Sequence, residues 1–209
     1  MKWVFVVALA GCQGGGFNGV AVGNPTMNAR LAETDGVDVS LAKGTLSAAF
    51  SPCGRGDPTV VVLGDVNLAS AVRFQGPPQA SCTLTLGFVD ALTVSGQGAG
   101  GTLAATFAPF VIEFPLADED ALGLSPFYTV ELGPPEWLAA VADDLATGEV
   151  HIEIGQPGYD ALASSLMGSS ALFLDDGDGV AGPDERAAGA LSTSRAGDAT
   201  LFPLDDTGL

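Results

Sequence analysis

Alternating apolar and polar residues form short segments along the first two thirds of the chain, and Gly, Pro and Asp separate these segments. Such alternation is typical of β-strands that bury one face. It predicts strands at 37–41, 45–50, 82–86, 88–94, 102–107 and 110–114. The continuous apolar run 60–63 predicts a central strand buried on both faces, and the glycine-rich segment 95–101 predicts a loop. This density of strands and turns predicts an antiparallel β-sandwich or barrel-like domain.

The last third of the chain changes to a helical pattern. Trp137, Val141 and Leu145 fall on one face of a helix predicted over 134–145. A second short helix is predicted over 159–167, and short strands are predicted at 150–154 and 171–174. We therefore expect residues 26–209 to fold as a single, mainly β domain with two short helices in its C-terminal third.

The N-terminal segment differs in composition from this domain. Lys2 is followed by a short apolar run that ends in Leu9-Ala10-Gly11-Cys12. The run is shorter than the roughly 20 residues of a membrane-spanning helix, but it has the length of the apolar region of a signal peptide. Its last four residues match the pattern Leu, small residue, Gly or Ala, and Cys. The segment therefore resembles a bacterial lipoprotein signal peptide.

This resemblance covers the leader alone, and it implies both processing and location. In lipoproteins the signal peptide, here 1–11, is removed before the Cys, and the thiol, here that of Cys12, carries lipid. The polar, glycine-rich start of 12–25 predicts a flexible tether. Gln13 stands where some inner-membrane lipoproteins have Asp. The expected location is the bacterial cell envelope at the outer membrane, with the membrane as a partner through the lipid anchor.

The charge of the chain is strongly negative. It has 25 acidic and 7 basic residues, a net charge of −18, and no Lys or Arg between Arg73 and Arg186. Such a surface repels phosphate groups, so we expect no nucleic-acid partner. It favours divalent cations or basic partners, although negative charge also serves solubility alone.

The three cysteines agree with export. Lipidation of Cys12 leaves Cys53 and Cys82, which we expect to form a disulfide in an oxidising compartment. Cys53 lies in a turn-rich loop, and Cys82 lies in a predicted strand. Two Cys and one distant His provide too few soft ligands for a metal site.

The segment 174–185 is the strongest candidate for a ligand site. An EF-hand loop has an invariant Gly at its sixth position, and Gly179 fits that position. The ligands that this alignment predicts are the side chains of Asp176, Asp178 and Glu185 and the carbonyl of Val180. Over about a dozen residues, the segment resembles the calcium loops of EF-hand-like and dockerin-like modules.

The same segment departs from those calcium loops in three respects. Leu174 replaces the first acidic ligand, Gly182 occupies a later ligand position, and a predicted strand precedes the loop in place of a helix. Asp175 and Asp184 are neighbouring acids that would compensate. Two interpretations remain open: a weak Ca²⁺ site and an acidic surface turn without metal.

The sequence contains few residue patterns that are typical of an active site. His151 is the single histidine, and the alternation of its strand predicts that it faces solvent beside Glu153. No Gly-x-Ser-x-Gly elbow accompanies it. The acidic groups 118–120 and 143–144 are candidates for the paired carboxylates of a glycosidase, but sequence spacing does not give their separation in space.

Three functional hypotheses follow from these observations. The first is a non-enzymatic envelope lipoprotein with a binding or structural role and an envelope protein or polysaccharide as its partner. The second is a calcium-responsive adhesion or assembly module. The third is an envelope hydrolase of glycans or esters, which the single histidine and the missing nucleophile motif disfavour.

Overall fold

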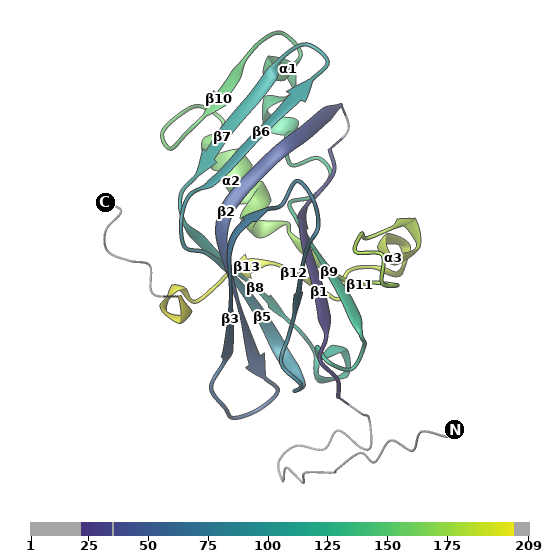
Figure 1. Cartoon of the computed structure of the whole chain (residues 1–209). Helices are drawn as coiled ribbons and strands as arrows, with labels where there is room; N and C mark the ends of the chain where they lie inside the picture. The colour runs from purple at the N-terminus through teal and green to yellow at the C-terminus, as the bar shows by residue number, and fades with distance from the viewer. Residues whose placement is uncertain (1–21, 35, 203–209) are drawn as a thin grey trace.

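The computed structural model describes residues 22–34 and 36–202, and it contains two curled β-sheets that form a half-barrel sandwich (Figure 1). The strands are β1 Thr26–Leu31, β2 Val37–Pro52, β3 Thr59–Asn67, β4 Val72–Gln75, β5 Ser81–Phe88, β6 Leu92–Gly98, β7 Thr102–Phe107, β8 Phe110–Pro115, β9 Phe127–Leu132, β10 Val150–Ile152, β11 Ala171–Leu174, β12 Ser192–Thr193 and β13 Arg195–Ala196. The helices are α1 Ala142–Leu145, α2 Tyr159–Gly168 and α3 Pro183–Ala188, with 3₁₀ turns η1 Asp118–Asp120, η2 Ala139–Val141 and η3 Ala199–Leu201. The predicted fold class is confirmed.

The predicted signal peptide, the lipidation site Cys12 and most of the predicted tether lie outside the described residues. Within the described ranges, no helix is both long and apolar enough to cross a bilayer.

Strand β2 organises the larger sheet. The sequence pattern predicts two strands at 37–41 and 45–50, but the structure joins them into one strand of 16 residues. Its first half pairs with β6, and its second half lies between β3 and β5. The sheet therefore has two halves that share β2, and the buried residues Leu46, Ala48 and Phe50 lie in the half that two neighbours flank.

The smaller sheet has the order β12-β11-β9-β1-β4, with β1 parallel to β9. Met27, Ala29 and Leu31 point into the core between the sheets and are buried. The alternate residues Asn28 and Arg30 therefore point to the outer face of this sheet. That outer face is where the acidic segment 175–185 lies.

A disulfide joins Cys53 to Cys82, as predicted, with the two Cα atoms 4.8 Å apart. It links the loop after β2 to the start of β5, next to the pair formed by Pro52 and Ser81. The covalent loop that it closes contains all of β3 and β4.

Residues 192–202 close one side of the sandwich. Strand β12 pairs with β11 in the smaller sheet, and β13 pairs with β8 in the larger one. The hydroxyl of Ser192 donates to the carbonyl of Pro115 at 2.6 Å. The ring of Phe202 then packs on Gly87, where any Cβ would overlap it.

The prediction that 60–63 forms a central buried strand is wrong. These residues belong to β3, which pairs only with β2 among the described strands. Val62 is 74% exposed and Val60 is 45% exposed. A continuous apolar run predicts a strand, but it does not predict whether that strand is central or at an edge. The position depends on which strands pair with it in the tertiary structure.

Several predicted boundaries also change. Strand β5 runs through Gly87 to Phe88, and β6 begins at Leu92, so no single strand spans 88–94. Strand β6 continues to Gly98, so most of the predicted loop 95–101 is a β-hairpin arm. Gly100 and Gly101 are required there because a Cβ at either would overlap the backbone of residues 145–148.

The two predicted helical segments are in the right positions, but the first of them is not one continuous helix. The segment predicted as one helix over 134–145 becomes a turn, η2 and the single helical turn α1. Its apolar face is nevertheless buried, since Trp137, Val141 and Leu145 are at most 4% exposed. Helix α2 matches the second prediction, whereas α3 was not expected because its residues were assigned to the calcium loop.

Candidate functional site

The acidic segment 175–185 folds against the outer face of the smaller sheet, between β11 and α3 (Figure 1). Asp175 anchors it there, because its Oδ2 accepts hydrogen bonds from the hydroxyl of Thr129 and, at 3.4 Å, from the amide of Asn28. Gly179 lies against the same Asn28 side chain. The sequence analysis considered Asp175 only as a substitute ligand, and its role as an anchor depends on β1 and β9.

The carboxylates of this segment converge. Asp175, Asp176 and Asp178 each offer an oxygen within 4.8 Å of the other two. Glu185 belongs to α3 but returns to the start of the loop, where its Oε1 accepts from the backbone N–H of Asp176 at 3.3 Å. Of the predicted calcium side chains, Asp176 and Asp178 thus share one cluster with Asp175, and Glu185 reaches the backbone at the start of the loop.

Backbone hydrogen bonds hold the loop in this shape. Asp175 Oδ1 accepts from the N–H of Gly177 at 2.5 Å and of Gly179 at 3.3 Å. Asp178 Oδ1 accepts from the N–H of Val180 at 2.8 Å. Gly177 and Gly179 have φ of +110° and +85°, values that favour glycine. The loop is therefore a tight turn whose acids cap its own amides.

This set of donors has the chemistry that Ca²⁺ prefers, since every side-chain ligand is a carboxylate oxygen. Asp175 takes the place that Leu174 cannot fill, and Val180 remains the predicted backbone ligand. The arrangement agrees equally with an acidic turn, because the same carboxylates already cap backbone amides. Calcium binding at Asp176, Asp178, Val180 and Glu185 therefore stays a prediction.

Calcium is expected to raise the melting temperature of the protein. With a dissociation constant of about 10⁻⁴–10⁻³ M, calcium at about 10 mM stabilises the fold by about 1.4–2.7 kcal/mol. This corresponds to about 3–11 °C for a domain of this size. Melting curves in calcium and in chelator measure it. Asp178→Asn is expected to abolish the rise, and the control Asp160→Asn, at an exposed acid on α2, is expected to retain it. Equal melting temperatures in calcium and chelator would leave only an acidic turn.

An ion pair between partly exposed Arg186 and buried Glu131 attaches α3 to the same outer face. Arg186 Nη2 lies 2.6 Å from Glu131 Oε2, and the Glu131 side chain is only 4% exposed. Arg186 Nε also donates to the carbonyl of Ala181 at 2.9 Å. Burial raises the pKa of Glu131, and the positive charges of Arg186 and Arg30 partly oppose this rise. Glu131 was not predicted as a functional residue, because no local pattern distinguishes it within its largely apolar strand β9.

The free energy of unfolding is expected to depend on pH through the protonation of Glu131. A carboxyl group whose folded pKa is raised contributes stability at low pH, and that contribution is lost as the pH rises through the folded pKa. Relative to Glu131→Gln, the wild type should therefore lose free energy of unfolding as the pH rises above 4.5, the ordinary pKa of Glu. Urea unfolding of both proteins across this range measures the difference. A wild type that gains stability relative to the variant would contradict the prediction.

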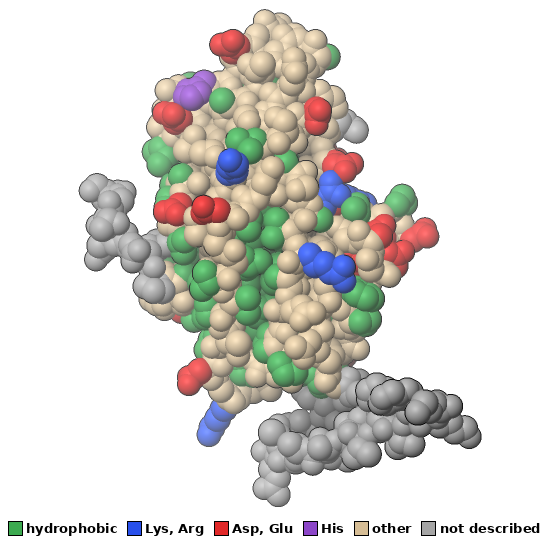
Figure 2. Space-filling model, in the orientation of Figure 1, with side chains coloured by type: hydrophobic (Ala, Val, Ile, Leu, Met, Phe, Trp, Pro, Cys, Tyr) green, Lys and Arg blue, Asp and Glu red, His purple; other side chains and the backbone are tan. Residues whose placement is uncertain are grey.

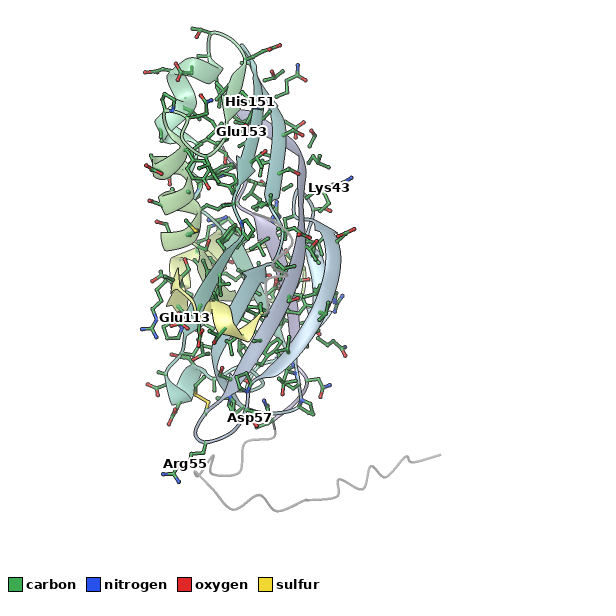
Figure 3. The ribbon with its side chains drawn as sticks, turned by 90° about the vertical axis from the view of Figure 1, so that its left-hand side faces the viewer. Lys43, Arg55, Asp57, Glu113, His151 and Glu153 are labelled. Carbon is green, nitrogen blue, oxygen red and sulfur yellow. A yellow bond between two sulfur atoms is a disulfide. The ribbon has the colours of Figure 1, made fainter. Side chains whose placement is uncertain are left out.

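His151 lies on the edge strand β10, and Figure 3 shows it beside Glu153 at one end of the long sheet. Its Nε2 is 3.0 Å from Glu153 Oε1, and the two side chains are 63% and 54% exposed. The prediction of a solvent-facing histidine is confirmed. Among the described residues, Glu153 is its one recorded ionic partner.

The two acidic groups proposed as paired carboxylates lie far apart. Asp118 has its Oδ1 3.3 Å from Cys82 Sγ, at the start of β5. Asp143 and Asp144 are in α1, at the opposite end of the molecule (Figure 1). They cannot flank one glycosidic bond, which requires carboxyl groups within about 10 Å.

An apolar cleft of about 500 Å³ lies beside α1. The β6–β7 hairpin and the start of β2 form one wall, and the segment from Pro135 to Ala146 forms the other. The space stays open because side chains on both walls are small. They include Ala99, Ala139 and Ala142. Glu136 is the one charged residue among the described residues that line it. The sequence analysis missed this cleft because its walls are distant along the chain.

Comparisons with known proteins find no protein-family model, no curated protein and no solved structure that matches this chain.

Proposed function

We propose that this protein is a lipid-anchored, non-enzymatic binding protein of the bacterial envelope that holds an apolar ligand in the cleft beside α1. The cleft carries this proposal, because a concave apolar site of about 300–1,000 Å³ is the typical form of a small-molecule site. The signal-peptide resemblance at Leu9–Cys12 supports the envelope location and the anchor.

The chemistry of the polar groups supports a binding role over an enzymatic one. His151 is exposed, and its partner Glu153 is equally open to solvent. Glu131 and Asp175 are held in contacts that attach α3 and its loop to the sheet. Among the described residues that line the cleft, Glu136 is the one acidic group, and no second titratable side chain accompanies it. Hydrolysis of ester, peptide or glycoside substrates that His151→Ala abolishes would overturn the non-enzymatic assignment.

The lining of the cleft favours a particular ligand class. Val37, Leu138 and Leu145 provide apolar contacts, and Glu136 provides a negative charge. A ligand with an apolar body and a neutral or cationic head therefore fits better than an anionic one, because a carboxylate repels a like charge.

Filling the cleft is expected to remove ligand binding. Titration calorimetry with dodecylamine and with dodecanoate on the Cys12→Ser protein should show tighter binding of the amine. Ala142→Phe places a ring in the cleft and should weaken amine binding by at least about tenfold, a loss of about 1.4 kcal/mol. Ala140 is an exposed neighbour outside the lining, so Ala140→Phe is the matched control and should bind normally. Equal binding by both variants would remove the cleft from the proposal.

A second candidate function is a calcium-responsive adhesion or assembly module. The convergence of Asp175, Asp176 and Asp178 on the surface favours it. The two functions are distinguishable, because calcium would raise the melting temperature in either case but would promote self-association or partner binding only in the second.

A further inference from the structure

A carboxylate lies against the Cys53–Cys82 disulfide at the surface of the molecule. Asp118 Oδ1 is 3.3 Å from Cys82 Sγ, and the two sulfur atoms and a carboxylate oxygen of Asp118 all lie within 4.8 Å of one another. Both cysteines are only partly buried, and Asp118 is exposed. The bond between the sulfur atoms, which Figure 3 draws in yellow, is therefore partly open to solvent and to dissolved thiols.

Backbone hydrogen bonds on both sides of η1 hold Asp118 in this position. On one side, the N–H of Leu116 donates to the carbonyl of Cys82 at 2.8 Å. On the other side, Ser81 and Leu122 exchange two backbone hydrogen bonds at 3.1 and 2.9 Å. The short segment between these contacts contains η1, so the turn that carries Asp118 stays beside the disulfide.

The contact between Asp118 and Cys82 places a negative charge beside the sulfur atoms without a donor to compensate it. A disulfide sulfur has lost the S–H group of a free thiol, so it cannot donate a hydrogen bond to the carboxylate. Within residues 22–34 and 36–202, no ion pair involves Asp118. The charge of this carboxylate therefore acts directly on the chemistry of the disulfide.

The basic side chains nearest along the chain or in neighbouring strands are directed elsewhere. Arg195 is engaged with Glu113, at 2.5 Å between Nε and Oε1. In Figure 2, a Lys or Arg side chain projects into solvent from the lower end of the molecule, and Figure 3 identifies Arg55 there, extending away from the ribbon. The negative charge of Asp118 is therefore screened mainly by solvent and salt.

A negative charge at this position opposes thiol–disulfide exchange. In this reaction a thiolate attacks one sulfur atom and forms a new disulfide bond with it, while the electron pair of the broken bond leaves on the other cysteine as a thiolate. A second thiol then releases the first cysteine, so the protein disulfide is reduced to two thiols and the two attacking thiols are oxidised to a disulfide. Asp118 repels both the attacking thiolate and the leaving thiolate, because like charges a few Å apart raise the energy of the step.

We propose that Asp118 is a guard residue that protects the Cys53–Cys82 disulfide from reducing thiols. Asp118 acts whichever sulfur atom is attacked, because its carboxylate lies within 4.8 Å of both. The guard keeps the covalent loop closed around β3 and β4 when the protein meets a small thiol or a dithiol oxidoreductase. This role is independent of the cleft beside α1 and of the lipid anchor.

Reduction of the folded protein by three small thiols tests the proposal. The parent protein is the full chain with Cys12→Ser, which leaves one pair of cysteines. The thiols are mercaptoethanesulfonate, mercaptoethanol and cysteamine, which carry an anionic, a neutral and a cationic group beside the sulfur. Alkylation stops the reaction, and mass spectrometry measures the mixed disulfides on each cysteine. The charge variant is Asp118→Asn, and its matched control is Glu119→Gln, at the adjacent exposed acid in η1.

Asp118→Asn should react with mercaptoethanol about three- to tenfold faster than the parent protein. The gain should be largest for the anionic thiol and smallest for cysteamine, because the lost interaction is a repulsion between charges. Salt at about 1 M, where the Debye length is about 3 Å, should reduce the difference between the variant and the parent. Glu119→Gln should change the rate by less than about twofold, because its charge is farther from the sulfur atoms and more strongly screened.

Three results would overturn the proposal. Equal rates in Asp118→Asn and the parent would show that the carboxylate does not affect exchange. An equal gain with all three thiols would indicate that the variant has a looser fold, since a lost charge discriminates among them. A gain in Glu119→Gln as large as that in Asp118→Asn would indicate an effect of the net charge of this end of the molecule and not of the residue that contacts Cys82.

Discussion

Replacing both Cys53 and Cys82 by serine is expected to lower the free energy of unfolding by about 3–4 kcal/mol. The disulfide spans a sequence separation of 29, so removing it restores a large loop entropy to the unfolded chain. The loop contains β3 and β4, and each of them pairs with one strand outside the loop, β2 and β1 respectively. Urea unfolding of the double variant under oxidising conditions measures the loss.

Reduced wild-type protein is the control for this experiment, because it has the same sequence without the covalent link. It should unfold at the same urea concentration as the double variant. A loss below about 1 kcal/mol would contradict the chain-entropy account. In the double variant, faster amide exchange in β3 and β4 than in β9 would show that the disulfide mainly stabilises the two strands inside its covalent loop.

Replacing Cys12 by serine is expected to abolish lipid attachment and to leave an unprocessed or soluble product. Each buried methylene contributes about 0.8 kcal/mol to membrane binding, and a single acyl chain holds a protein only marginally. Lipoproteins typically carry three chains, so losing them should move nearly all of the protein from the membrane fraction. Membrane fractionation and intact-mass measurement of both proteins test this.

Cys53→Ser is the matched control for lipidation, because it removes a cysteine that the structure places in a disulfide. That variant should keep the lipid and the membrane location. A Cys12→Ser protein that stays in the membrane fraction at the normal mature mass would refute the lipoprotein assignment. The proposed envelope function would then lose its anchor.

The apolar cleft and the acidic loop lie on different parts of the molecule. The cleft lies beside α1 and the β6–β7 hairpin, and the acidic loop lies between β11 and α3. Figure 1 shows α1 and α3 far apart. Arg55 and Asp57 mark the end of the long sheet opposite His151 (Figure 3). Occupation of one surface therefore does not block another.

The fold class, the disulfide and the location of most strands were predictable from the order of residues alone. Period-two alternation depends on local burial alone, so β7 and β8 were predicted within a residue of their bounds. The disulfide followed from a count of three cysteines, one of which has a separate role. The exposed position of His151 followed from the alternation around it.

Which strands are central and which residues form sites depends on long-range packing, which local sequence patterns do not predict. The run 60–63 in β3 is as apolar as a central strand, yet β3 lies at an edge, because β2 is its one strand partner within residues 22–34 and 36–202. Glu131 and Asp175 became anchors because β1, β9 and α3, which are distant along the chain, meet on one face. The cleft arises in the same way, because residues that are distant along the chain form its two walls, and no local sequence pattern predicts such contacts.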